Sequence, residues 1–150
     1  MATDEFAIAF TVGAPAKTVY ARLIDPRNYI GLCPSVVEVR DIRPSHDDQH
    51  HETVSYLAIE RFRAGFLRWD NKIRVTLVAA RVGRRLVRET RRPARVRLTA
   101  TVDLADLAEG TSITETIRVT APAIFRNLVR GRAESVQRAR AAELTRRMAD

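Results

Sequence analysis

Between residues 36 and 120 the chain alternates apolar and polar side chains with a period of two, and no helical pattern interrupts this region. Period two places successive side chains on opposite faces of a β-strand. Short turns, such as Val82-Gly83 and Glu109-Gly110, separate the runs. Consecutive strands joined this closely pair antiparallel, so the sequence predicts an antiparallel meander with one packed face and one solvated face. The predicted strands of this meander are residues 36–42, 52–64, 66–80, 84–92, 94–104 and 111–120.

Helical patterns occur only near the two ends of the chain. A strand-like run, residues 6–12, is followed by Pro15 and by apolar residues at helical spacing. Asp25-Pro26 ends this first short helix and begins a second one, which Pro34 stops. After Pro122 a helical pattern with one apolar stripe continues through the rest of the chain. The concave face of the sheet is the surface that such a stripe would cover.

Composition fits a globular protein of one domain, with 150 residues, 45% hydrophobic and 29% charged. The lone cysteine, Cys33, excludes an intrachain disulfide, and the N-terminus lacks the basic region of a signal peptide. No apolar run is long enough for a transmembrane helix, so we expect a cytoplasmic protein. The net charge of +8 comes mostly from arginine, which is enriched in residues 84–97 and 126–147. These arginines either steer anionic partners or form a solvated surface.

The order of elements resembles the START-like (SRPBCC) superfamily, and the stretch "APAKTVYARLIDPRNYIGLCPSVVEV" (residues 14–39) is similar to its usual opening. That superfamily includes polyketide cyclases and dehydratases, lipid-transfer domains, coenzyme-Q-binding proteins and plant pathogenesis-related allergens. The resemblance implies one α+β domain over residues 1–150 with the helix-grip fold. In this fold a curved antiparallel sheet of six or seven strands wraps around a long C-terminal helix, and two short helices follow the first strand. It also implies a cavity for apolar ligands between the sheet and that helix.

Several polar residues share the predicted inward faces. Glu115 stands between Ile113 and Ile117, where burial would raise its pKa. Glu60 is in phase with Tyr56, and Asn71 is in phase with Trp69. Arg132 lies on the apolar stripe of the last helix. A carboxylate and a guanidinium facing one cavity suit acid–base chemistry, with Glu115, Glu60 and Arg132 as the candidate catalytic residues. The other interpretation is a buried Glu–Arg pair or residues that reach water, and one β-bulge would turn either carboxylate outward.

The predicted ligand-binding residues are the inward-facing positions of the strands and the stripe of the last helix: Tyr56, Trp69, Asn71, Ile73, Leu98, Ile117, Phe125, Leu128 and Val136.

No metal site is predicted, because "SHDDQHH" (residues 45–51) confines its candidate ligands to one polar turn. No cofactor is predicted either. Phosphate loops, the GxSxG elbow, HExxH and the dinucleotide fingerprint are all missing from the sequence, which argues against nucleotide-dependent catalysis and serine hydrolysis. The first functional hypothesis is a protein that binds or carries a lipid, polyketide or isoprenoid. The second is a cyclase, aromatase or dehydratase that uses the pocket carboxylates with Arg132 and Tyr56. The third is an RNA-, ribosome- or membrane-binding protein with an arginine-rich surface.

Overall fold

The computed structural model describes residues 1–149, and its strands form a single seven-stranded antiparallel sheet. The strand order is β1-β7-β6-β5-β4-β3-β2, so every strand of the meander pairs with its sequence neighbour and β1 joins the last strand. The strands are β1 (Ala2–Val12), β2 (Val36–His46), β3 (Glu52–Ala64), β4 (Leu67–Arg81), β5 (Arg85–Arg92), β6 (Val96–Leu107) and β7 (Gly110–Ala121). The helices are α1 (Ala16–Leu23), η1 (Pro26–Tyr29), η2 (Ala123–Phe125) and α2 (Arg126–Arg147). The predicted α+β helix-grip architecture is confirmed.

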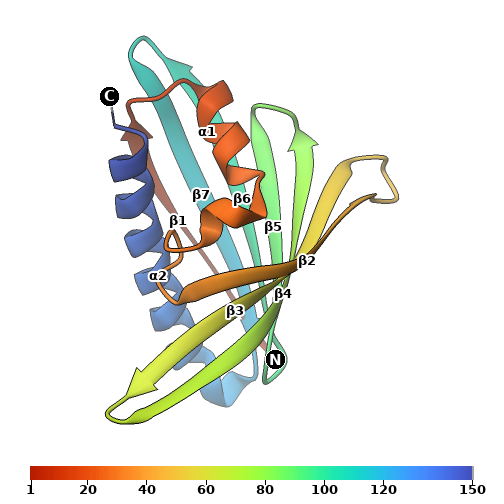
Figure 1. Ribbon diagram of the computed structural model, residues 1–150, viewed down its shortest axis with the longest axis vertical. Helices are drawn as coiled ribbons and strands as arrows, with labels where there is room; N and C mark the ends of the chain where they lie inside the picture. Colours follow the sequence, from red (N-terminus) through yellow and green to blue (C-terminus); the bar gives the residue numbers. More distant parts are fainter. Residues whose placement is uncertain (150) are drawn as a thin grey trace.

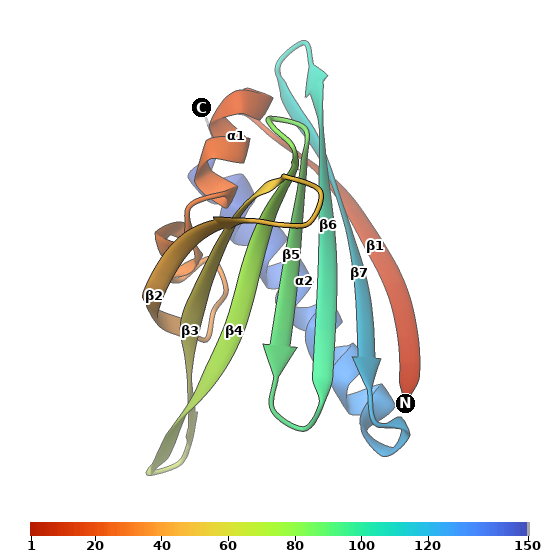
Figure 2. The ribbon, with the colours of Figure 1, turned by 90° about the vertical axis from the view of Figure 1, so that its right-hand side faces the viewer.

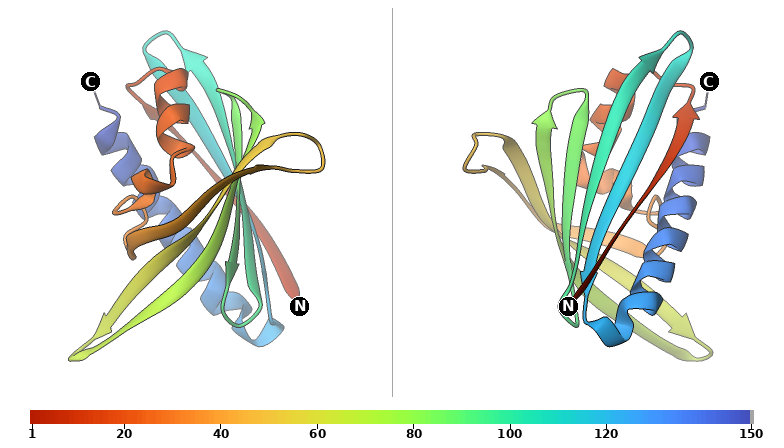
Figure 3. Two further views of the ribbon diagram at one scale, coloured as in Figure 1. Left: turned by 45° about the vertical axis from the view of Figure 1, so that its right-hand side comes forward. Right: turned by 180° about the vertical axis from the view of Figure 1, so that it is seen from behind.

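The sheet is strongly twisted, and α1 and α2 lie on the same face of it (Figures 1 and 2). Helix α2 runs along β1 and β7, and the β3–β4 hairpin projects beyond the body of the sheet (Figures 1 and 3). The segment containing α1 and η1 links β1, at one edge of the sheet, to β2 at the other edge.

The second predicted helix is shorter than its pattern suggested. The Asp25 side chain accepts a hydrogen bond from the backbone N–H of Arg27 at 3.0 Å, which begins a single 3-10 turn, η1. The chain then leaves the helical conformation at Ile30 and turns at Gly31, whose φ of +77° suits glycine. The Tyr29 hydroxyl donates to the carbonyl of Leu23 at 2.6 Å and so fixes η1 against α1.

The main hydrophobic core lies where α1 and η1 meet the concave face of the sheet. Its fully buried members include Val19, Tyr29, Leu77 and Ile113. The C-terminal half of α2 contributes Leu144 to the same cluster. Packing is therefore solid at this end of the molecule.

A buried ion pair fastens α2 to the sheet. Arg140 Nη2 of α2 donates to Oε1 of Glu115 of β7 at 2.5 Å, and both side chains are about nine-tenths buried. Gln137, one turn earlier, donates to the backbone carbonyl of Glu115 at 3.1 Å. Arg88 Nη2 of β5 lies 3.5 Å from the other carboxylate oxygen. The Glu115 side chain therefore connects β7 to both α2 and β5.

Two further contacts hold the ends of α2. Near its N-terminus, Arg126 Nη2 lies 2.9 Å from a carboxylate oxygen of the buried Asp4 on β1, and Arg130 approaches the same oxygen. At the C-terminus, Arg147 donates to the backbone carbonyls of Asn28 and Ile30. These contacts fix the helix along the β1 side of the sheet and beside η1.

The ionisation of Glu115 differs from the sequence-based expectation. Burial raises the pKa of this carboxyl group, but the guanidinium groups of Arg140 and Arg88 outweigh burial and hold the pKa below its usual range. The expected increase in pKa is therefore wrong, because the sequence does not show which cations face Glu115. The carboxylate is charged at neutral pH.

Glu115→Gln should destabilise the protein by about 3–5 kcal/mol at pH 7, because it leaves two buried guanidinium groups without their carboxylate. Because the pKa of Glu115 is lowered on folding, its contribution is present above the unfolded-state pKa of about 4.3 and is lost as pH falls below it. The stability difference between wild type and variant, measured by urea unfolding, should therefore stay constant above about pH 5.5 and narrow as pH falls from there through the lowered pKa of the folded state. Glu5→Gln, at an exposed position of β1, is the matched control and should show no such difference. A difference that stays constant with pH would contradict a charged Glu115.

Candidate functional site

A cavity of about 310 Å³ lies between the concave face of the sheet and the N-terminal half of α2. Volumes near 300 Å³ are at the lower end of those that hold small-molecule ligands. Much of the wall is apolar and comes from β3, β4, β6, β7 and α2. The apolar lining residues are Val36, Ala58, Ile73, Val75, Pro93, Val96, Leu98, Ala100, Ile117, Leu128, Val129, Ala133 and Val136.

The cavity exists because α2 is held away from this part of the sheet. Gln137 and Arg140 bind Glu115, whereas Val129, Ala133 and Val136 of the same helix line the cavity. Small side chains on both walls, such as Ala100 and Ala133, leave the volume open.

Aromatic and cationic side chains line the cavity near β2 and β3. The rings of Tyr29 and Tyr56 stack with centroids 6.4 Å apart. The guanidinium carbon of Arg88 lies 5.5 Å from the centroid of Tyr29, a cation–π contact. Burial raises the pKa of both tyrosines well above the ordinary value, so both hydroxyl groups are neutral donors. Cys33 lies within reach of Arg140, with Sγ 3.8 Å from Nη1.

The charged state of Arg88 follows from its carboxylate neighbour. Burial lowers the pKa of a guanidinium group, but Glu115 outweighs this effect and raises the pKa of Arg88. A permanent positive charge therefore faces the cavity.

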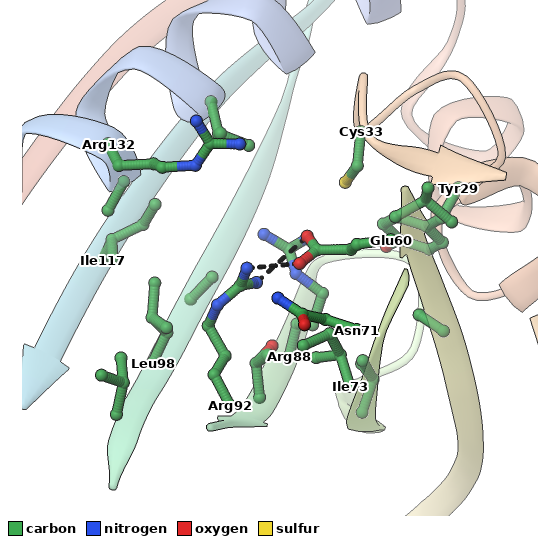
Figure 4. A pocket seen from close by; sticks show the side chains of 18 of the residues that line it. Tyr29, Cys33, Glu60, Asn71, Ile73, Arg88, Arg92, Leu98, Ile117 and Arg132 are labelled. Carbon is green, nitrogen blue, oxygen red and sulfur yellow. Dashed lines mark hydrogen bonds and ion pairs between the residues drawn. The ribbon is translucent and has the colours of Figure 1, made fainter. Parts of the chain in front are cut away.

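A second ion pair lies across the cavity from α2. Arg92 of β5 donates through both terminal nitrogens to the two carboxylate oxygens of Glu60 on β3, with one contact at 3.1 Å (Figure 4). Asn71, which pairs with Glu60 across the β3–β4 ladder, lines the cavity beside it. This bidentate pairing fixes the position of the Glu60 carboxylate.

Arg132 faces the cavity from α2. Its guanidinium carbon lies 4.9 Å from the centroid of Phe62, near the end of β3. The cation–π contact connects the helix with the projecting hairpin across the rim of the cavity.

Most of the predicted site residues line this cavity. They are Glu60, Arg132, Tyr56, Asn71, Ile73, Leu98, Ile117, Leu128 and Val136. Their roles in binding or catalysis stay predictions.

Three predicted residues lie outside the lining. Glu115 faces inward as expected, but α2 covers it and it borders a much smaller void. Trp69 is 47% exposed and stacks on Phe62 with ring centroids 5.8 Å apart, because this part of the β3–β4 hairpin extends beyond the cavity. Phe125 is 40% exposed because it belongs to η2, before the apolar stripe of α2 begins. The sequence predicted the correct strands for Glu115 and Trp69, but it placed Phe125 on the last helix, and none of the three residues lies in the cavity lining.

Sequence reasoning missed Arg88, Arg92 and Arg140. On β5 the buried Leu86 and Arg88 lie on the same face as Arg92. The period-two pattern of "RRLVRETRR" could therefore have predicted that both arginines point inward. Arginines on both faces of the strand obscured it. Arg140 lies one helical turn after Gln137 and one before Leu144, all three of them buried, and helical spacing alone could have placed it.

Some of the remaining arginines on or beside the sheet are paired with acids. Arg61 binds Asp70 and Arg85 binds Asp103 between strands, and Arg84 of the β4–β5 turn binds Asp106 of β6. Acids thus interleave with these basic residues. Binding of nucleic acid stays a prediction.

Two searches for other kinds of site gave no candidate within residues 1–149. That part of the chain contains no cluster of three histidine, cysteine, aspartate or glutamate side chains arranged to bind a metal ion. Neither α1 nor α2 combines the length and the apolar character that crossing a bilayer requires.

Sequence comparison gave no match to a protein-family model or to a curated protein. Solved structures match well. One is the di-domain aromatase/cyclase StfQ from the steffimycin biosynthetic pathway, with a TM-score of 0.72 and 12% identity over 98% of this chain and 50% of that one. This chain thus spans half the length of the di-domain protein.

Two other matches cover both partners almost fully. The aromatase/cyclase ZhuI from Streptomyces sp. R1128 has a TM-score of 0.68 and 17% identity over 97% of this chain and 96% of its own. Ara h 8.0201 has a TM-score of 0.66 and 8% identity over 95% of this chain and 98% of its own. The feature shared at these identities is the fold. The chain therefore shares the helix-grip fold of these proteins, as its sequence predicted.

Proposed function

We propose that this protein binds a hydrophobic small molecule, of the lipid, polyketide or isoprenoid class, in the cavity beneath α2. The observation that carries the proposal is an apolar-walled space of about 310 Å³ inside an otherwise packed fold. Apolar surface that remains unpacked in a core costs stability, because its atoms lack contact partners. A ligand of matching shape would restore those contacts.

The cavity also has the polar features that orient a ligand. Arg88, Tyr56 and the Glu60–Arg92 pair project from two strands, β3 and β5, into a mostly apolar wall. A few polar groups among many apolar ones are typical of small-molecule sites. The similarity to aromatase/cyclases agrees with this proposal at the level of fold.

Ala133→Phe should weaken binding of the neutral fluorescent probe N-phenyl-1-naphthylamine by about tenfold or more, because the new ring occupies the cavity from α2. Ala139→Phe adds the same ring to an exposed position of the same helix and should leave binding unchanged. Fluorescence titration measures both affinities, and circular dichroism checks that both variants fold. Absence of probe binding to wild type, or equal effects of the two substitutions, would contradict the proposal.

The second candidate is catalysis of the cyclase or dehydratase type. The observation in its favour is that Glu60, Tyr56 and Arg132 line one cavity. The pairing of Glu60 with Arg92 and the placement of Glu115 outside the lining weaken it.

If the cavity is catalytic, wild type should convert a linear poly-β-ketone thioester to a cyclised product with loss of water, detected by liquid chromatography and mass spectrometry. Glu60→Gln should abolish the conversion but leave probe binding intact, since the residue would be required for proton transfer. Recovery of the thioester unchanged from wild type that binds the probe would favour a carrier.

A further inference from the structure

Arg88 is a buried cation that the fold neutralises only in part. Its side chain is 9% exposed, and its one ion pair within residues 1–149 is the contact with Oε2 of Glu115 at 3.5 Å. Charge-assisted hydrogen bonds between nitrogen and a carboxylate are usually 2.7–2.9 Å long. Arg140 takes the other oxygen of Glu115 at 2.5 Å. The carboxylate is therefore engaged mainly by Arg140.

The buried charges at this end of the cavity do not balance. Two guanidinium groups, Arg88 and Arg140, face one carboxylate, Glu115, and one positive charge remains. The neighbouring Arg92 and Glu60 neutralise each other. Among the described residues, Glu60 is the one carboxylate in the cavity lining. A buried charge without a counter-ion destabilises the folded protein. A bound anionic ligand would provide the missing counter-ion.

The groups beside Arg88 are hydrogen-bond donors. The Tyr29 ring lies against the guanidinium, and the Tyr29 hydroxyl is used by the Leu23 carbonyl. Tyr56 lines the cavity next to Tyr29, and within residues 1–149 no hydrogen bond engages its neutral hydroxyl. A guanidinium with unused N–H groups and a free phenolic O–H together call for an acceptor with negative charge.

We propose that the cavity selects an amphiphile with an anionic head group, such as a carboxylate, which binds Arg88 and Tyr56. Its apolar body then lies along Leu98, Val129 and Val136. A negative head group matches the unbalanced positive charge beside Arg88, whereas a cation would be repelled. The inference rests on the proposed function and specifies the class of its ligand.

The test compares three molecules with the same ten-carbon chain as competitors of N-phenyl-1-naphthylamine at pH 7.4: decanoate, decan-1-ol and decyltrimethylammonium. Decanoate should displace the probe at a concentration about 10- to 100-fold lower than decan-1-ol, as expected for a hydrogen bond to a charged group. Decyltrimethylammonium should be the weakest competitor. Decan-1-ol is the more hydrophobic of the first two molecules, so apolar burial alone predicts the opposite order.

Arg88→Gln should remove most of the advantage of decanoate over decan-1-ol, measured as the ratio of the concentrations at which the two molecules displace the probe from that variant. Arg91→Gln is the matched control, because Arg91 is exposed on the same strand, and should retain the advantage. Failure of wild type to bind the probe would overturn the proposed function itself. Probe binding with equal displacement by decanoate and decan-1-ol would overturn only the selectivity for an anion. The wild-type comparison decides between these outcomes even if Arg88→Gln does not fold.

Discussion

The contact between Glu115 and Arg140 is the constraint on which the site depends. It joins the middle of β7 to α2 in a buried position, and Gln137 reinforces it on the backbone of the same residue. With Asp4 holding the start of the helix and η1 holding its end, the axis of α2 is fixed. The helix therefore cannot collapse onto β5 and β6, and the unfilled space between them is the cavity.

The charged residues of the interior have different tasks. Glu115 and Arg140 hold the helix, and Glu60 and Arg92 join β3 to β5 across the cavity wall. Arg88 belongs to neither pair completely, because it shares Glu115 at the longer distance. The Glu115–Arg140 pair, which stabilises the fold, thus also holds Arg88 in place. Arg88 keeps N–H groups that can bind a ligand in the cavity.

The sequence predicted the fold better than the site, for physical reasons. Period-two alternation is local, so the inward phases of Glu60, Glu115 and Asn71 could be read directly. The extent of the cavity, in contrast, depends on contacts between residues that are far apart in the sequence. Trp69 points to the same face of β4 as Asn71, but it lies in the part of the β3–β4 hairpin that projects beyond the rest of the sheet, and it is therefore exposed. Likewise, the pKa of Glu115 depends on Arg88 and Arg140, which are distant in the chain.

Native mass spectrometry of freshly purified protein, before and after organic extraction, tests the central claim most directly. A cavity that binds a hydrophobic small molecule predicts a bound apolar mass that extraction removes and that returns when the extract is added back. A bare polypeptide mass in both samples, with no uptake of the extract or of a neutral apolar probe, would contradict the account.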